Sequence, residues 1–125
     1  MAQFDLESTY LSLDGKGAVA THPVGPDFWA TIENNRSLLS TLMTVSTSVS
    51  DWITWEMHPE GAEILVLLEG RLTMVLDDGT GERRHPMAPG AMLVVPARTW
   101  HRALIAEPTR MLFVTHGAGT THRPI

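Results

Sequence analysis

Glycine and proline residues break this chain into short segments, and this limits the folds it can adopt. Ten glycines and eight prolines are spread over 125 residues, and the runs between them are rich in Val, Ile, Leu, Thr, Met and Trp. Short apolar and β-branched runs bounded by turn-forming residues are typical of strands. We therefore expect an all-β sandwich or barrel, with strands near residues 28–33, 38–48, 51–58, 63–69, 71–77, 82–86, 91–95, 100–106 and 109–116.

The turn residues indicate one folded body with a flanking segment at each end. The Asp-Asp-Gly sequence at residues 77–79 has the chemistry of a hairpin turn, and Gly70 falls where one strand bends into the next. Glycine and proline interrupt residues 1–37, which we expect to form an N-terminal arm packed on the body. The body spans residues 38–116, and residues 117–125 are expected to form an irregular tail.

Composition excludes several functional classes. The formal net charge is −5, Lys16 is the only lysine, and the chain has no cysteine. No basic stripe is available to follow a phosphate backbone, and thiolate chemistry is excluded. An apolar run such as Ile64–Leu68 is five residues long, which is far too short to span a membrane. We expect a cytoplasmic protein without a nucleic-acid or membrane partner.

Four side chains in two segments could converge on one point. Strand residues alternate between faces, so Glu56 and His58 point the same way. The chain turns at residues 59–62, and Glu63 then opens the next strand beside that pair. His101 begins another strand after the turn that follows Pro96. Imidazole and carboxylate donors together suit first-row divalent metals.

These residues resemble the two sequence motifs of the cupin superfamily. The first motif has a His-x-His pair followed by a glutamate and a glycine; here Glu56-Met57-His58 precedes Glu63 and Gly70, with glutamate in place of the leading histidine. The second motif runs from a glycine to Pro-x-Gly, a histidine and an asparagine. The residues at the same spacing in this chain are Gly90, Pro96, Arg98, His101 and Ile105. Arg98 thus stands in place of the second glycine, and Ile105 in place of the asparagine.

The resemblance covers roughly residues 38–116 and implies a cupin fold, a jelly-roll barrel also described as a double-stranded β-helix. It also implies a metal held inside the barrel by Glu56, His58, Glu63 and His101. Glutamate at position 56 supplies an oxygen donor, so the substitution changes metal preference rather than abolishing binding. The expected cofactor is a divalent ion of Fe, Mn, Ni or Zn, and the expected assembly is a homodimer.

The expected ligand is a small, partly apolar molecule with an oxygen pair that can chelate the metal. The predicted pocket lining consists of Trp52, Leu65, Met92 and Phe113. The chemistry implied is that of a dioxygenase or isomerase, with Glu56 as the candidate catalytic base if it does not coordinate. His122 lies in the tail and is assigned no role.

Three alternatives stay open from the sequence. Glu56 and Glu63, taken singly, are more often surface carboxylates than ligands. The chain could be a non-enzymatic sensor that binds a small molecule, or a structural barrel without metal. Fold alone does not choose among these, because one barrel architecture hosts many functions.

Overall fold

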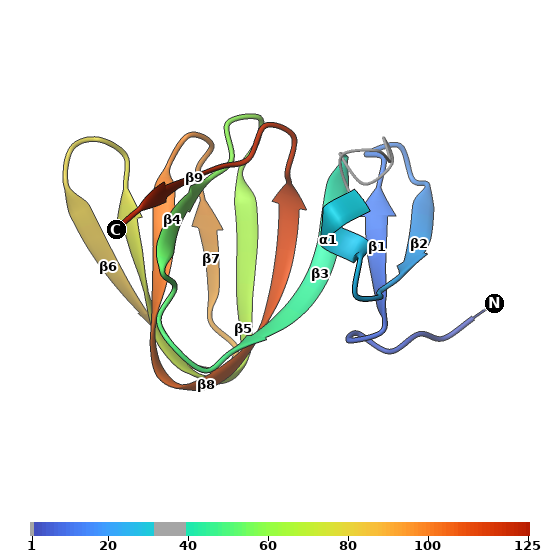
Figure 1. Cartoon of the computed structure of the whole chain (residues 1–125), viewed down its shortest axis with the longest axis horizontal. Helices are drawn as coiled ribbons and strands as arrows, with labels where there is room; N and C mark the ends of the chain where they lie inside the picture. Colours follow the sequence, from blue (N-terminus) through green and yellow to red (C-terminus); the bar gives the residue numbers. More distant parts are fainter. Residues whose placement is uncertain (1, 32–39) are drawn as a thin grey trace.

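The protein is all-β apart from one short helix. The computed structural model describes residues 2–31 and 40–125 (Figure 1). Its elements in chain order are β1 (Thr9–Leu13), β2 (Val19–Pro23), α1 (Phe28–Thr31), β3 (Thr41–Ser48), β4 (Thr54–Met57), β5 (Glu63–Asp77), β6 (Glu82–Met87), β7 (Met92–Val95), β8 (Trp100–His116) and β9 (Thr121–Pro124).

Two long antiparallel strands, β5 and β8, form the frame of the barrel. Their first and last parts pair through Leu65↔Phe113 and Leu76↔His101, and the register is irregular between Leu67 and Leu72. At this irregularity both strands bend, so each strand belongs to both sheets of the jelly roll (Figure 1). The predicted strands 63–69 and 71–77 are therefore one strand, and so are 100–106 and 109–116.

Gly70 makes the bend in β5 sterically feasible. Its φ is +86°, a conformation that L side chains rarely adopt, and a Cβ at this position would collide with the carbonyl oxygen of Pro108 on the opposing strand. The close approach of the two backbones at the bend thus depends on the absence of a side chain.

The bend separates two sheets that enclose the core. One sheet is built by pairing in the order β2-β1-β3-β8-β5-β7, and the other in the order β9-β4-β8-β5-β6. A cluster of apolar side chains fills much of the space between them, and burying each large one contributes roughly 1.5–3 kcal/mol. The buried members of this core are Leu65, Leu67, Leu72, Met74, Leu76, Met87, Val95, Ala103 and Met111.

The N-terminal segment extends one sheet to the side of the barrel. Strand β1 pairs with β3 through Leu11↔Met43, and the β1–β2 hairpin projects away from the barrel with α1 beside it (Figure 1). Tyr10, Phe28 and Leu42 form a small core of their own, in which the Tyr10 and Phe28 rings meet edge to face at 5.0 Å.

Two predicted elements differ from the structure. The expected strand at residues 28–33 is replaced at its start by helix α1, because Phe28 is buried against Tyr10 and is not part of a sheet. The predicted tail 117–125 contains strand β9, which pairs with β4 over four residue pairs. Residues 38–39 of the expected strand 38–48 lie outside the described residues. Within the described part of the chain, no helix is long and apolar enough to cross a membrane.

Candidate metal centre

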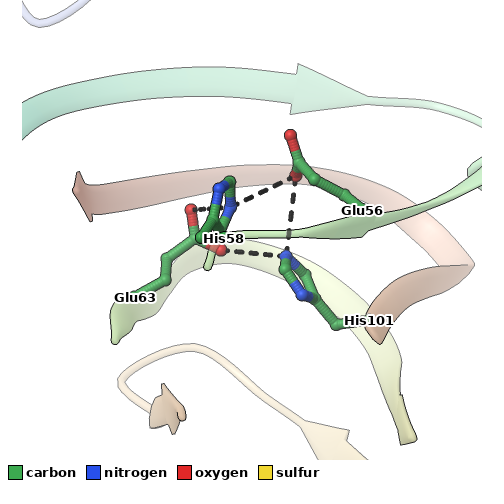
Figure 2. Close-up of side chains that lie close together, drawn as sticks. All are labelled: Glu56, His58, Glu63 and His101. Atoms are coloured by element: carbon green, nitrogen blue, oxygen red, sulfur yellow. Dashed lines mark ion pairs between the residues drawn. The ribbon is translucent and has the colours of Figure 1, made fainter. Parts of the chain in front are cut away.

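Strand pairing brings the four candidate ligands to one end of the barrel. Glu56 lies in β4 and His58 follows that strand on the same face, while Glu63 opens β5. His101, near the start of β8, is the direct cross-strand partner of Glu56. Figure 2 shows the four side chains pointing toward a common centre.

The donor atoms lie close enough to share one ion. One carboxylate or imidazole atom from each residue lies within 4.8 Å of the corresponding atoms of the others. The Nε2 atoms of His58 and His101 lie 3.2 and 3.1 Å from the two carboxylate oxygens of Glu63. The same nitrogen atoms lie 3.7 and 3.6 Å from Oε2 of Glu56.

Three of the four side chains are removed from solvent. His101 is fully buried, and His58 and Glu63 are nearly so, whereas the Glu56 side chain is 25% exposed. The Nε2 atoms of both histidines and Oε1 of Glu63 are buried and have no hydrogen-bond partner among the described residues. Buried polar atoms without a partner are costly, so their convergence on one point needs a group that satisfies them.

Hydrogen bonds behind the histidines orient both rings. Nδ1 of His101 lies 3.1 Å from the carbonyl oxygen of Thr99, which can only accept, so Nδ1 carries the proton. Nδ1 of His58 lies 2.7 Å from Oγ1 of Thr120, whose own proton is donated to the carbonyl oxygen of Gly117. Nδ1 of His58 is therefore also the donor, and both Nε2 lone pairs face the centre when the rings are neutral.

Glu63 is held as an anion. Burial raises the pKa of its carboxyl group, but the neighbouring imidazoles of His101 and His58 outweigh burial and lower the pKa from 4.5 to about 2. The hydroxyl group of Thr115 donates a further hydrogen bond to Oε2 of Glu63. The carboxylate charge is therefore available to a cation at neutral pH.

His101 shows the complementary effect. Burial lowers the pKa of its imidazole, but the neighbouring carboxylates of Glu56 and Glu63 outweigh burial and raise the pKa from 6.5 to about 9. The cluster without metal therefore holds a proton between the carboxylates of Glu56 and Glu63 at neutral pH. A cation bound at this point would take the place of that proton.

The residues fit a divalent metal ion. Two neutral imidazoles and two carboxylates balance a charge of +2, and this donor set suits Fe, Mn or Zn. The buried set of His58, Glu63 and His101 has the two-histidine, one-carboxylate composition of non-haem iron sites, which leave positions open for other ligands.

A cavity of about 580 Å³ opens above this cluster. Its walls come from the inner face of β3, the β4 strand with its preceding segment, the second half of β8 and the turn before β9. The described residues lining it are Trp29, Leu42, Thr44, Ser46, Ser48, Trp52, Glu56, His58, Glu63, Phe113, Thr115, Gly117, Gly119, Thr120 and His122.

Two of the four predicted pocket residues line this cavity. Trp52 and Phe113 stack at 6.3 Å and form its apolar wall. Leu65 points inward as expected but is fully buried in the core and is not part of the described lining. The expectation for Met92 is wrong, since it is 69% exposed: the inward positions of β7 are Leu93 and Val95.

Three side chains that were not predicted from the sequence contact the cluster. Thr115 and Thr120 bond Glu63 and His58, and His122 of β9 lies 3.3 Å from Oε1 of Glu56. Alternation within β8 places Thr115 on the same face as Phe113, a signal available from the sequence. Thr120 and His122 had no such signal, because Thr120 lies in a turn and β9, which carries His122, is short and polar.

The fold and the convergent histidine and glutamate side chains define a double-stranded β-helix protein with a site suited to one metal ion. The sequence pattern of the cupin domain family matches residues 43–115. The chain therefore belongs to the cupin family, as the motif resemblance predicted.

Solved structures share this fold at low sequence identity. A cupin-2 domain protein from Shewanella frigidimarina has a TM-score of 0.53 and 17% identity, covering 61% of this chain and 70% of its own. An oxalate oxidase in complex with glycolate has a TM-score of 0.57 and 17% identity over 67% of this chain and 46% of its own.

The iron(II) form of HppE has a TM-score of 0.53 and 20% identity over 61% of this chain. The match covers 46% of the oxalate oxidase chain and 42% of the HppE chain, so this chain spans less than half the length of either enzyme. No curated protein matches the sequence.

Proposed function

We propose that the protein is a metal-dependent enzyme, a dioxygenase or isomerase, that acts on a small chelating molecule. A divalent ion of Fe, Mn, Ni or Zn would be held by Glu56, His58, Glu63 and His101. The observation that carries this proposal is the set of buried, unpartnered donor atoms of His58, Glu63 and His101 that face one point. Solved structures with this fold support it, since they include Fe(II) and Co(II) forms of HppE and a hydroquinone 1,2-dioxygenase in complex with Cd²⁺.

The bound ion would supply a Lewis acid or a binding point for oxygen. The chain itself contributes orientation and charge. Thr99 and Thr120 fix the two imidazoles, Thr115 holds Glu63, and the fully buried His101 keeps water from the inner side of the centre. Glu56 is the most exposed of the four carboxylate and imidazole groups, so it is the member best placed to accept a proton from a ligand if it leaves coordination.

The cavity walls indicate the kind of ligand. Trp52 and Phe113 offer an apolar wall for a flat body, and β3 presents the hydroxyl groups of Thr44, Ser46 and Ser48 on another side. No arginine or lysine occurs among the described lining residues, so a ligand with several negative charges finds no counter-charge there. A small, partly apolar molecule with two adjacent oxygen atoms fits these walls.

Metal analysis and oxygen uptake test the proposal together. Protein purified without chelators should contain about one equivalent of a first-row metal by X-ray fluorescence or plasma mass spectrometry. The loaded protein should then consume oxygen with, or isomerise, a member of a panel of diols, diketones and phenols. Protein that takes up none of these ions after chelation and reloading would contradict the proposal.

The two alternatives predict different outcomes of the same experiment. A structural barrel would bind no metal, which the unpartnered donor atoms of the cluster disfavour. A sensor would bind metal and a ligand of the panel without turnover. Ligand binding followed by absorbance, with no oxygen uptake and no isomerised product, would favour the sensor.

We also propose that the protein is a homodimer formed through the outer face of the sheet containing β3, β8, β5 and β7. Two rows of outward side chains cross these strands and are apolar: Met43–Val114–Ile64–Val94 and Leu112–Val66–Met92. Val45, which extends the second row, is buried within the monomer. A contiguous apolar face marks an interaction surface. A twofold-related copy presents the same uncharged face. Light scattering should give twice the chain mass, and Val94→Lys should give the monomer mass.

A further inference from the structure

The C-terminal segment, residues 117–124, lies against the candidate metal centre although it falls outside the family match. The match ends at residue 115, and strand β9 pairs with β4 through four residue pairs from Thr54↔Pro124 to Met57↔Thr121. One of these pairs places His122 directly opposite Glu56. Figure 1 shows β9 running beside β4.

The segment is held in place at both of its ends. The Arg123 guanidinium lies over the rings of Trp100 and Trp55 at 4.5 and 5.2 Å and reaches Asp77 at 3.5 Å. At the other end, the turn of residues 117–120 packs against the loop after β4, where a Cβ at Gly119 would meet Cγ of Pro59 at 3.1 Å. The position of the turn relative to His58 is therefore defined.

Thr120 uses both functions of its hydroxyl group at this turn. The hydroxyl proton is donated to the carbonyl oxygen of Gly117 at 2.7 Å, so the oxygen atom accepts from Nδ1 of His58, also at 2.7 Å. This bond leaves Nε2 of His58 as the atom that faces Glu63. Outer partners of this kind orient ligating histidines in metal sites.

His122 contacts Glu56, the most exposed of the four candidate ligands. Its Nε2 lies 3.3 Å from Oε1 of Glu56, whereas Oε2 of the same carboxylate is the atom nearest to His58 and His101. The contact therefore engages one carboxylate oxygen and leaves the other directed into the centre. His122 itself is 56% exposed and lines the cavity, so it is also accessible to a ligand.

We infer that the C-terminal segment is a functional part of the metal centre, in which Thr120 and His122 are positioning residues that aim His58 and Glu56 at the ion. This inference rests on the proposed metal binding. It assigns a role to two side chains beyond the four ligands and beyond the part of the chain that defines the family.

Cobalt(II) binding to the full chain tests the inference, with affinity measured by chelator competition and geometry by the visible absorption spectrum. Thr120→Val keeps the side-chain shape but removes the acceptor of His58, and should weaken Co²⁺ affinity roughly 10–100-fold. Thr120→Ser should restore the affinity. His122→Ala should change the Co²⁺ spectrum, because Glu56 loses the contact that holds Oε1. Thr121→Val, at the next position of β9, is the matched control and should bind as the wild type does.

Each result supports or overturns the inference. Equal affinity and equal spectra for wild type, Thr120→Val and His122→Ala would overturn it and leave the proposed metal binding intact. An equal loss in Thr121→Val would show a general effect of β9 on stability and would also overturn it. Absence of Co²⁺ binding by the wild type would overturn both proposals. If Thr120→Val does not fold by circular dichroism, the comparison of Thr120→Ala with Thr120→Ser replaces it.

Discussion

Glu56 of β4 and His101 of β8 are direct cross-strand partners, with Oε2 and Nε2 3.6 Å apart. Two strands that start far apart in the sequence thus deliver a carboxylate and an imidazole to one point. Sheet pairing would hold the two groups in position around a cation, and the negative charge of Glu56 would attract it.

His101→Ala should release the metal while the barrel stays folded. The variant removes one nitrogen donor and the group that pairs with Glu63 at 3.1 Å. We expect metal content to fall from about one equivalent to less than a tenth, measured by plasma mass spectrometry alongside circular dichroism. His85→Ala, on β6 outside the cluster, should retain its metal. Full occupancy in His101→Ala would remove His101 from the ligand set.

The metal-free protein should lose stability as the pH rises from neutrality. The pKa of His101 is raised from 6.5 to about 9 in the folded state, so its contribution is fully present below pH 6.5 and disappears as the pH passes 9. Urea unfolding in the presence of a chelator, at intervals from pH 6 to pH 10, measures this directly. The decline should be smaller in His101→Gln. A flat profile for the wild type would contradict the paired, charged state of the cluster.

Gly70→Ala should destabilise the protein severely. The added methyl group would collide with the carbonyl oxygen of Pro108, and alanine resists the φ of +86°. We expect a loss of about 3 kcal/mol or more in the free energy of unfolding, or insoluble protein. Gly79 also has a positive φ, but a Cβ there would meet no atom within 4 Å. Gly79→Ala should therefore lower the free energy of unfolding by less, about 1–2 kcal/mol. Equal costs at both positions would contradict the steric explanation.

Arg98→Gly should be more stable than Arg98→Ala. Arg98 is the one non-glycine residue with positive φ in the described chain, at 61°, and stands where the cupin motif has glycine. Glycine relieves the left-handed strain, whereas alanine keeps it, so we expect a difference of about 1 kcal/mol in favour of glycine. Chemical unfolding of the two variants measures it. The reverse order would show that the strain at residue 98 is negligible.

Trp52→Ala should weaken ligand binding without releasing the metal. Trp52 stacks with Phe113 and lies 6.2 Å from the ring of His101, so its removal takes away one apolar wall of the cavity. A coloured catechol can serve as the probe, and its affinity for the metal-loaded protein should fall roughly tenfold. Metal content should remain that of the wild type. Unchanged catechol affinity would exclude this wall from the ligand site.

Local sequence patterns were sufficient to predict that Glu56, His58 and Glu63 lie together. Glu56 and His58 share a strand face because of the two-residue period of a strand, and Glu63 follows a tight loop. His101 follows a turn after Pro96, but no local pattern relates it to the other three residues. The cupin spacing joined the two halves, and the family match confirms the fold.

The sequence-based predictions were wrong where contacts between distant parts of the chain determine the local structure. Strand β7 is apolar on both faces, so alternation does not say whether Met92 or Leu93 points inward. Strand β9 is polar and short, and it is held by pairing with β4 and by the rings beneath Arg123. Neither contact is visible in the sequence of residues 117–125. The helix at Phe28 likewise depends on burial against Tyr10, which is distant along the chain.

Leu42 belongs to two environments, since it packs in the aromatic cluster with Tyr10 and Phe28 and also borders the cavity. One wall of the cavity is thereby shared with a structural unit that contributes none of the four candidate ligands. Under the proposed function, substitutions among those rings would alter which ligand is bound and leave the coordination of the ion unchanged. Ligand selectivity and metal binding could then be altered, by evolution or by engineering, independently of each other.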